Sequence, residues 1–207
     1  MRVLIADDHA VLREGVKSVL AAMPGIGEID EAANGNTAMD KIKEHDYDMV
    51  ILDISMPGSN GFDILRHIRD TGNPVRTLVI SFHPEEQYAA RAFRLGASGY
   101  ISKCASFGQI RKAIARVARG GRYVSPEFAE KLAFANNSNS SLHENLSDRE
   151  FQVMLMLARG ESVSDIARKA FISDKTVSTY RSRILKKMGM KSNADLTRYA
   201  IHTGLIE

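Results

Sequence analysis

The sequence is poor in the features that mark secreted and membrane proteins. It has one cysteine, Cys104, among 207 residues, which excludes an internal disulfide or a multi-cysteine metal cluster and is typical of a reducing cytosol. No stretch approaches the roughly 18 consecutive apolar residues of a membrane-spanning helix. Asp7 and Asp8 come too early for the apolar core of a signal peptide. We therefore expect a soluble cytoplasmic protein with no membrane partner.

The whole chain also has little excess of charge of either sign. The net charge is +3, and 44% of the residues are hydrophobic and 26% charged, which excludes wholesale disorder and fibrous composition. At roughly 100 to 200 residues per domain, the length allows one large domain or two small ones. Residues 135–145 are too polar to pack and predict a flexible linker. We expect one domain over 1–122, a linker with a short helix over 123–145, and a second domain over 146–207.

Short apolar runs alternate with segments of helical period in the first 120 residues, as in parallel strands joined by crossover helices. The expected strands are 3–6, 28–31, 49–52, 77–80 and 100–101. The expected helices begin near Ala10, Asn36, Phe62, Glu86 and Phe107. The first helix is expected to bury the stripe Val11, Leu12, Val16, Val19 and Leu20. This α/β pattern predicts a doubly wound, flavodoxin-like five-stranded parallel sheet, whose ligands bind outside the carboxyl ends of the strands.

Four of these five strand ends carry a functional group. Asp7 and Asp8 end the first strand and Asp53 ends the third, so three carboxylates should converge. Like charges at close range disfavour ionisation, and a hard divalent cation such as magnesium relieves this. Ser81 and Lys103 end the fourth and fifth strands, and a phosphoryl group on a carboxylate oxygen needs such partners. One aspartate alone would more often be a turn or helix cap.

Together these residues resemble the receiver domain of two-component response regulators, over about residues 1–122. The match includes the phosphoacceptor loop at 52–61, Leu-Asp-Ile-Ser-Met-Pro-Gly-Ser-Asn-Gly. The resemblance implies that Asp53 accepts a phosphoryl group from a sensor histidine kinase. It also implies a magnesium or manganese site formed by Asp7, Asp8, Asp53 and the backbone carbonyl of Ser55. The implied phosphate-stabilising and switch residues are Ser81, Tyr100 and Lys103.

Two alternatives to this function are open. A magnesium-dependent aspartyl phosphatase resembling the haloacid dehalogenases would carry a second acid two residues after the nucleophile, where this chain has Ser55. Without that general acid or base a phosphoaspartate persists, which favours a signalling protein over an enzyme. The other alternative is a pseudo-receiver that binds DNA independently of phosphorylation, and the complete set of site residues argues against it.

The carboxyl-terminal domain has helical periodicity alone, which predicts a small all-α domain of four helices. Serines mark the helix starts: Ser147 with Glu150 as a capping box, Ser162 with Asp165, Ser173, and Ser192 with Asp195. The expected helix ends are Gly160 and Gly189.

One part of this domain is strongly basic. The 24 residues from Arg168 to Lys191 hold eight basic side chains and one acid. Residues 162–169 and 173–188, which overlap this basic segment, have the layout of a helix-turn-helix, with Phe171 and Ile172 in the turn. The second helix has an apolar stripe of Val177, Tyr180, Ile184 and Met188. A basic amphipathic helix is equally typical of a solvated surface.

The wider segment favours DNA binding. Residues 146–150, 158–160, 165–167 and 172–177 resemble the LuxR-type helix-turn-helix of the NarL/FixJ response regulators. The resemblance implies DNA contacts by Lys175, Thr176, Ser178, Thr179, Arg181, Ser182, Arg183 and Lys186. Bases would face Ser178, Thr179 and Ser182, and phosphates would face Lys175, Arg181, Arg183 and Lys186. We expect a homodimer, formed on phosphorylation, that binds inverted half-sites of double-stranded DNA, with RNA polymerase as a further candidate partner.

Overall fold

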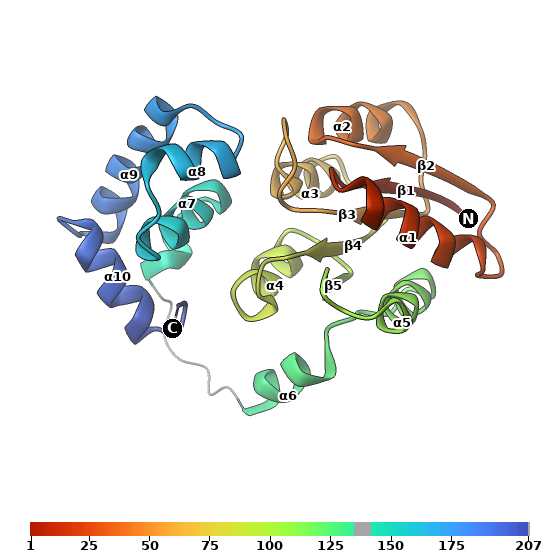
Figure 1. The fold of residues 1–207 in the computed structure, drawn as a ribbon. Coiled ribbons are helices and arrows are strands. Elements are labelled where there is room, and N and C mark those ends of the chain that lie inside the picture. Colours follow the sequence, from red (N-terminus) through yellow and green to blue (C-terminus); the bar gives the residue numbers. More distant parts are fainter. Residues whose placement is uncertain (135–141, 207) are drawn as a thin grey trace. The chain divides into compact units, whose positions relative to one another are not determined.

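The structure is a computed structural model that describes residues 1–134 and 142–206, so part of the predicted linker, 135–141, lies outside the described residues. The chain forms two compact units, Met1–Phe134 and Ala135–Glu207 (Figure 1). In the described part of the chain, no helix is long and apolar enough to cross a membrane.

A five-stranded parallel sheet forms the centre of the first unit. Its strands are β1 (Arg2–Ala6), β2 (Glu28–Ala32), β3 (Met49–Leu52), β4 (Arg76–Ser81) and β5 (Gly99–Ser102). Their order is β2-β1-β3-β4-β5, which confirms the doubly wound fold. The order reverses between β1 and β3, and in such sheets the ligand site lies where the order reverses. Asp7 and Asp53 directly follow these two strands.

Helices cover both faces of the sheet (Figure 1). They are α1 (Ala10–Ala21), α2 (Gly35–Glu44), α3 (Gly61–Asp70), α4 (Glu85–Arg94) and α5 (Phe107–Ala118), and α6 (Pro126–Phe134) follows. The first five begin within one residue of their predicted starts. Val16 and Leu20 of α1 pack with Ile110 and Ile114 of α5 in one core cluster. The prediction that Val11 is buried is wrong, because it lies more than 100° around the helix from the centre of that stripe and is 89% exposed.

Two glycines let the loop after β3 approach the starts of α2 and α3. A Cβ at Gly35 would lie 1.7 Å from the backbone oxygen of Ser59, and one at Gly61 would lie 2.4 Å from that of Asp53. Asn34 caps α2 and Asn60 caps α3 through their side-chain oxygens. The loop that carries Asp53 is therefore packed backbone to backbone against two helix N-termini.

The second unit contains α7 (Asp148–Ala158), α8 (Val163–Lys169), α9 (Asp174–Met188) and α10 (Asn193–His202). All four predicted serine caps are confirmed, because each serine side chain accepts the expected backbone N–H. Gly160, two residues after the last residue of α7, and Gly189, directly after α9, have positive φ angles of 80° and 66°, as expected at helix ends. The interior is formed by apolar side chains from all four helices, among them Phe151, Leu155, Ile166, Val177, Ile184 and Leu196.

Part of the segment expected in the linker has regular structure. Leu142–Asn145 form a short 3₁₀ helix, η1. The backbone N–H of His143 donates to the Tyr199 hydroxyl of α10 at 3.3 Å, and His143 Nδ1 lies 2.9 Å from the same hydroxyl. These contacts attach η1 to the second unit, which composition alone does not reveal.

Candidate functional site

The acidic pocket lies at the carboxyl ends of β1, β3 and β5. Asp7 and Asp53 are each 1% exposed, and the side chain of Lys103 is fully buried between them. Lys103 Nζ lies 2.7 Å from Asp7 Oδ2 and 2.7 Å from Asp53 Oδ2. A buried carboxylate is costly unless a partner offsets the loss of water. One ammonium group compensates two carboxylates here, so the pocket keeps an excess of negative charge.

Burial raises the pKa of Asp53 to about 6. The charge of Lys103 opposes this shift, whereas the nearby Asp7 carboxylate adds to it. The backbone N–H of Ser55 donates to Asp53 Oδ1 at 3.1 Å and favours the ionised form. Asp53 is therefore mostly a carboxylate at neutral pH, and it gains a proton more readily than a surface aspartate.

The pocket has the donor set of a divalent cation site. One ligand atom from each of Asp7, Asp8, His9 and Asp53 lies within 4.8 Å of the others. Asp7 Oδ2 and Asp8 Oδ1 are buried, and each has one close ionic neighbour at 2.7 Å, Lys103 Nζ for Asp7 and His9 Nδ1 for Asp8. Buried carboxylate oxygens with unused acceptor capacity fit a hard cation. The sequence prediction missed His9, which its position beside the acidic pair could have indicated.

His83 connects the residues predicted to form the switch. Its backbone N–H donates to Ser81 Oγ at 3.1 Å, and its carbonyl accepts the Tyr100 hydroxyl at 3.0 Å. Its ring Nε2 lies 2.8 Å from Ser55 Oγ, and the ring stacks on Tyr88 with the centroids 4.3 Å apart. Tyr100 is completely buried, and burial raises its pKa well above the ordinary value. Its position two residues after Ser81 places His83 near the acceptor already in the sequence, but these bridging contacts depend on the folded loop.

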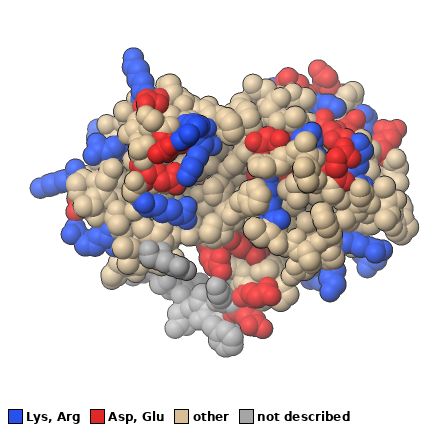
Figure 2. Space-filling model, viewed as in Figure 1, with Lys and Arg blue, Asp and Glu red and all other residues tan. Residues whose placement is uncertain are grey.

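The exposed face of α9 carries most of the predicted DNA contacts. Val177, Ile184 and Met188 are buried. The exposed members of the predicted set are Lys175, Ser178, Thr179, Ser182, Arg183 and Lys186. Figure 2 shows Lys and Arg side chains projecting from the carboxyl-terminal unit, with some Asp and Glu side chains among them. The structure thus presents six of the eight predicted side chains to solvent on one helix.

The remaining two predicted residues, and one further lysine, have bonds within the unit. Arg181 Nε donates to Asn193 Oδ1 at 2.7 Å, and the Thr176 hydroxyl lies 2.8 Å from that of Ser173. Lys187 Nζ is 2.6 Å from Oε2 of the buried Glu150. Lys187 therefore adds to the positive charge of this segment but is engaged in a structural ion pair.

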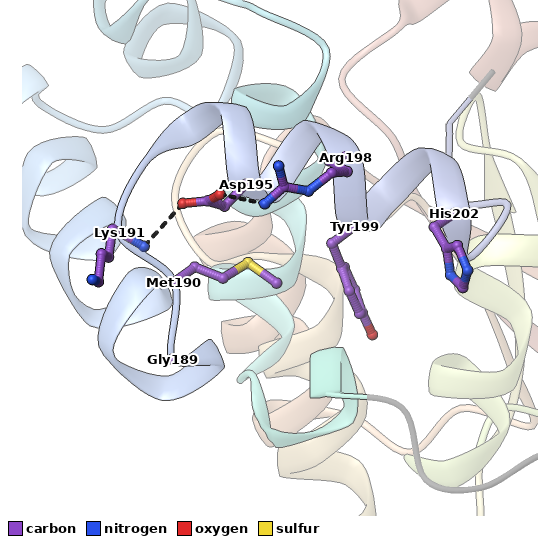
Figure 3. Close-up of a pocket in the computed structure, with 7 residues that line it drawn as sticks. All are labelled: Gly189, Met190, Lys191, Asp195, Arg198, Tyr199 and His202. Atoms are coloured by element: carbon purple, nitrogen blue, oxygen red, sulfur yellow. Dashed lines mark hydrogen bonds and ion pairs between the residues drawn. The ribbon is translucent and has the colours of Figure 1, made fainter.

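A pocket of about 510 Å³ lies beside α10 (Figure 3). Asp195 accepts the backbone N–H of Lys191 at 3.2 Å and pairs with Arg198 at 2.7 Å, while Tyr199 and His202 project farther along the helix. Its lining residues are Gly189, Met190, Lys191, Asp195, Arg198, Tyr199 and His202. None of the residues predicted to contact DNA belongs to this lining.

Comparisons with known proteins match both units. Residues 3–115 match the response regulator receiver domain, and residues 144–200 match the bacterial regulatory proteins of the luxR family. The chain is 33% identical over 210 residues to the response regulator GacA of Pseudomonas viridiflava, covering 100% of this chain and 98% of GacA. This chain belongs to the NarL/FixJ response regulators. It is a DNA-binding response regulator of two-component systems, and the phosphatase alternative has no support from these matches.

Other relatives agree with this assignment. The response regulator UvrY of Escherichia coli strain K12 is 33% identical over 208 residues, covering 99% of this chain and 95% of UvrY. The crystal structure of the response regulator ChrA of a heme-sensing two-component system has a TM-score of 0.51 at 30% identity, covering 99% of this chain and 98% of ChrA. RcsB of Salmonella enterica serovar Typhimurium, bound to promoter P1flhDC with the phosphomimetic BeF3-, has a TM-score of 0.67 at 24% identity over 96% of this chain and 97% of RcsB, which shows the fold.

Proposed function

We propose that this response regulator is activated when Asp53 accepts a phosphoryl group from a sensor histidine kinase in the cytoplasm. The observation that carries the proposal is the buried Asp53 carboxylate beside Lys103 at 2.7 Å. Ser81 ends the neighbouring strand β4 and is fully buried. Nucleophile, cation and hydroxyl thus occupy adjacent strand ends of the receiver.

The reaction exchanges one phosphorus bond for another. A carboxylate oxygen of Asp53 attacks the phosphorus of the kinase phosphohistidine, an oxygen–phosphorus bond forms and the nitrogen–phosphorus bond breaks. The departing imidazole nitrogen takes up a proton. Lys103 and the Ser81 hydroxyl stabilise the charge on the transferred oxygens, and preorganised groups of this kind contribute most of the catalysis in phosphoryl transfer.

Magnesium or manganese would be held by Asp8, Asp53 and the backbone carbonyl of Ser55. When bound, the cation neutralises charge on the phosphoryl oxygens. Asp7 positions the site, because its Oδ1 accepts the His9 backbone N–H at 2.8 Å while Oδ2 pairs with Lys103. The ligand atoms of Asp7, Asp8, His9 and Asp53, which lie within 4.8 Å of one another, support a cation at this position.

An exposed aromatic ring supports a protein partner at the pocket. Phe82, which directly follows Ser81, is 60% exposed. The Phe82 ring centroid lies 5.2 Å from Lys103 Nζ and 5.4 Å from the His9 ring. Large exposed apolar side chains beside a reactive group favour docking of another protein, and the kinase is the partner that must reach Asp53.

The output is regulated binding of double-stranded DNA. We propose that the phosphorylated protein dimerises and places α9 of each subunit in the major groove of an inverted half-site, with RNA polymerase as a further partner. The receiver would span 1–122, the linker 123–145 and the DNA-binding domain 146–207. The six exposed polar residues of α9 support this arrangement. The complex of the related RcsB fold with a promoter also supports it.

Incubation with acetyl phosphate and magnesium tests the phosphoacceptor. We expect wild type to gain one phosphoryl group by intact mass and Asp53→Asn to gain none. Equal phosphorylation of both proteins would contradict the assignment. DNA affinity is then measured with and without phosphorylation, and equal affinities would favour the pseudo-receiver.

A further inference from the structure

After α5 the chain returns to the free edge of the sheet. The backbone N–H of Tyr100 donates to the Tyr123 carbonyl at 2.9 Å, and that of Tyr123 donates to the Ser98 carbonyl at 3.1 Å. These bonds make a parallel bridge between Tyr123 and Gly99 of β5. A short segment that leads to α6 is thereby attached to the strand that carries Tyr100.

Ser125 then begins α6. Its hydroxyl accepts the Phe128 backbone N–H at 3.1 Å, and its carbonyl accepts that of Ala129 at 2.9 Å, which is the arrangement of a helix N-cap. The Ser125 backbone N–H donates to Oε1 of Glu85 at 2.9 Å. Glu85 is the first residue of α4 and is 9% exposed. One buried carboxylate therefore joins the first turn of α4 to the start of α6.

Glu85 also follows the β4–α4 loop, in which the His83 ring lies 2.8 Å from Oγ of Ser55, two residues after Asp53. Only Phe82, His83 and Pro84 separate Glu85 from Ser81, and the fixed backbone angle of proline limits how freely Glu85 can move relative to this loop. Tyr100 connects the β4–α4 loop with the segment that leads to α6. Its hydroxyl donates to the His83 carbonyl, and its backbone N–H donates to the Tyr123 carbonyl. A displacement of Ser81 and His83 must therefore change Glu85, Tyr100 or both.

Hydrogen bonds with Ser125 stabilise the ionised form of the buried Glu85 carboxylate. Burial raises the pKa of Glu85, whereas its hydrogen bonds with Ser125 lower it, and the charges of Glu86 and Glu127 raise it further. Separation of Glu85 from Ser125 would remove donors from a carboxylate that is already poorly solvated, which is costly. The intact and separated arrangements therefore differ enough in energy to act as two states.

We propose that the Glu85–Ser125 contact transmits the phosphorylation state of Asp53 from the β4–α4 loop to α6, and so sets the DNA affinity of the protein. The contact regulates the phosphorylation-dependent activity proposed above and rests on it. Glu85 acts as a positioning residue, because it acts through the Ser125 backbone N–H and not on the phosphoryl group. Its carboxylate fixes where α6 begins relative to the loop.

The test is the ratio of the DNA dissociation constants of the unphosphorylated and phosphorylated full-length protein. Glu85→Ala removes the acceptor, and Glu86→Ala is the matched control, an exposed glutamate in the same first turn. Both variants should gain the phosphoryl group from acetyl phosphate as wild type does. We expect the ratio to fall at least about 5-fold in Glu85→Ala and to be unchanged in Glu86→Ala. A general loss of stability would lower the melting temperature without moving this ratio.

Glu85→Gln and hydrogen exchange provide a second route if Glu85→Ala does not fold. The glutamine retains an oxygen acceptor without the charge, and we expect an intermediate ratio. In wild type, phosphorylation should change the exchange rate of the Ser125 amide but not that of Gly121, whose N–H donates to the Arg116 carbonyl.

The outcomes separate the two proposals. A wild-type ratio of one would overturn regulation by phosphorylation, and the role of the contact with it. A wild-type ratio above one that both Glu85 variants retain would overturn the role of the contact alone. An unchanged Ser125 exchange rate in phosphorylated wild type would do the same.

Discussion

The acidic pocket and the exposed face of α9 use charge in opposite ways. Asp7, Asp53 and Lys103 are each at most 6% exposed, and each has an oppositely charged partner. On α9 the polar side chains are exposed, and the Thr179 hydroxyl donates only to the Lys175 carbonyl of its own helix, at 2.9 Å. The charged side chains of the pocket therefore contribute strongly to the stability of the fold, whereas those on the exposed face of α9 contribute little. Substitutions in the acidic pocket should therefore change stability, and substitutions on the exposed face of α9 should change DNA binding.

Lys103→Ala should produce the largest effect. It leaves Asp7 and Asp53 buried without their cation, and loss of one partner of a buried ion pair costs about 3 to 5 kcal/mol. Urea denaturation in the absence of divalent ions measures the free energy of unfolding, and magnesium should recover part of the loss. Lys112→Ala, on an exposed position of α5, is the control. A loss below about 1 kcal/mol would mean that Lys103 contributes no more than a surface ion pair.

Asp53→Asn should stabilise the protein at pH 7. The folded-state pKa of Asp53 is about 6, above its ordinary 3.8, so the protonated form stabilises the fold at low pH. This stabilisation is lost as the pH rises through 6, and wild type then carries a buried charge that asparagine lacks. The free energy of unfolding of Asp53→Asn should therefore exceed that of wild type by about 2 to 3 kcal/mol above pH 6. This difference should disappear below about pH 4.

The measurement is the free energy of unfolding across this pH range, with a chelator present. Asp63→Asn, whose side chain is 52% exposed on α3, should change stability by less than about 0.5 kcal/mol. Equal stability of Asp53→Asn and wild type at pH 7 would show that Lys103 fully compensates the Asp53 charge.

The two regions also differ in how well the sequence predicts them. The pocket follows from strand positions, because consecutive parallel strands bring their carboxyl ends to one edge wherever they lie in the sequence. The serine caps follow from local hydrogen bonding. By contrast, the contacts of Arg181 with Asn193 and of Lys187 with Glu150 depend on how helices pack together. Local periodicity contains no such information, so the sequence predicts a phosphate contact for Arg181 and shows Lys187 only as one charge of a basic segment.

Lys186 and Lys187 offer a direct comparison within one helix. Lys186 is exposed, and we expect Lys186→Ala to lower the slope of log binding constant against log salt by about 0.9, with little change in stability. Lys187→Ala should leave the slope unchanged. It should cost about 1 to 2 kcal/mol of folding free energy because it removes the partner of buried Glu150.

DNA titrations at several salt concentrations and urea denaturation of the same proteins measure both effects. Burial raises the pKa of Glu150, but its hydrogen bonds with Lys187 and Ser147 hold it below the ordinary value, which supports a stabilising ion pair. Equal salt slopes for Lys186→Ala and wild type would remove Lys186 from the phosphate contacts. A reduced slope for Lys187→Ala would show that its ion pair opens on DNA.

The smallest effect is expected at Phe171, in the turn between α8 and α9. Its φ of 54° is left-handed, which costs a residue with a Cβ roughly 1 to 2 kcal/mol. Glycine removes this strain but adds unfolded-state entropy worth about 0.5 to 1 kcal/mol, so Phe171→Gly should stabilise by about 0.5 kcal/mol. Phe107→Gly is the control, because Phe107 is exposed to a similar degree (53% against 49% for Phe171) on an ordinary helical backbone. This variant should be destabilised. Urea denaturation measures both variants. If both lose equal stability, packing of the Phe171 ring outweighs the backbone strain. The exposed turn of the DNA-binding unit then contributes to the stability of the fold.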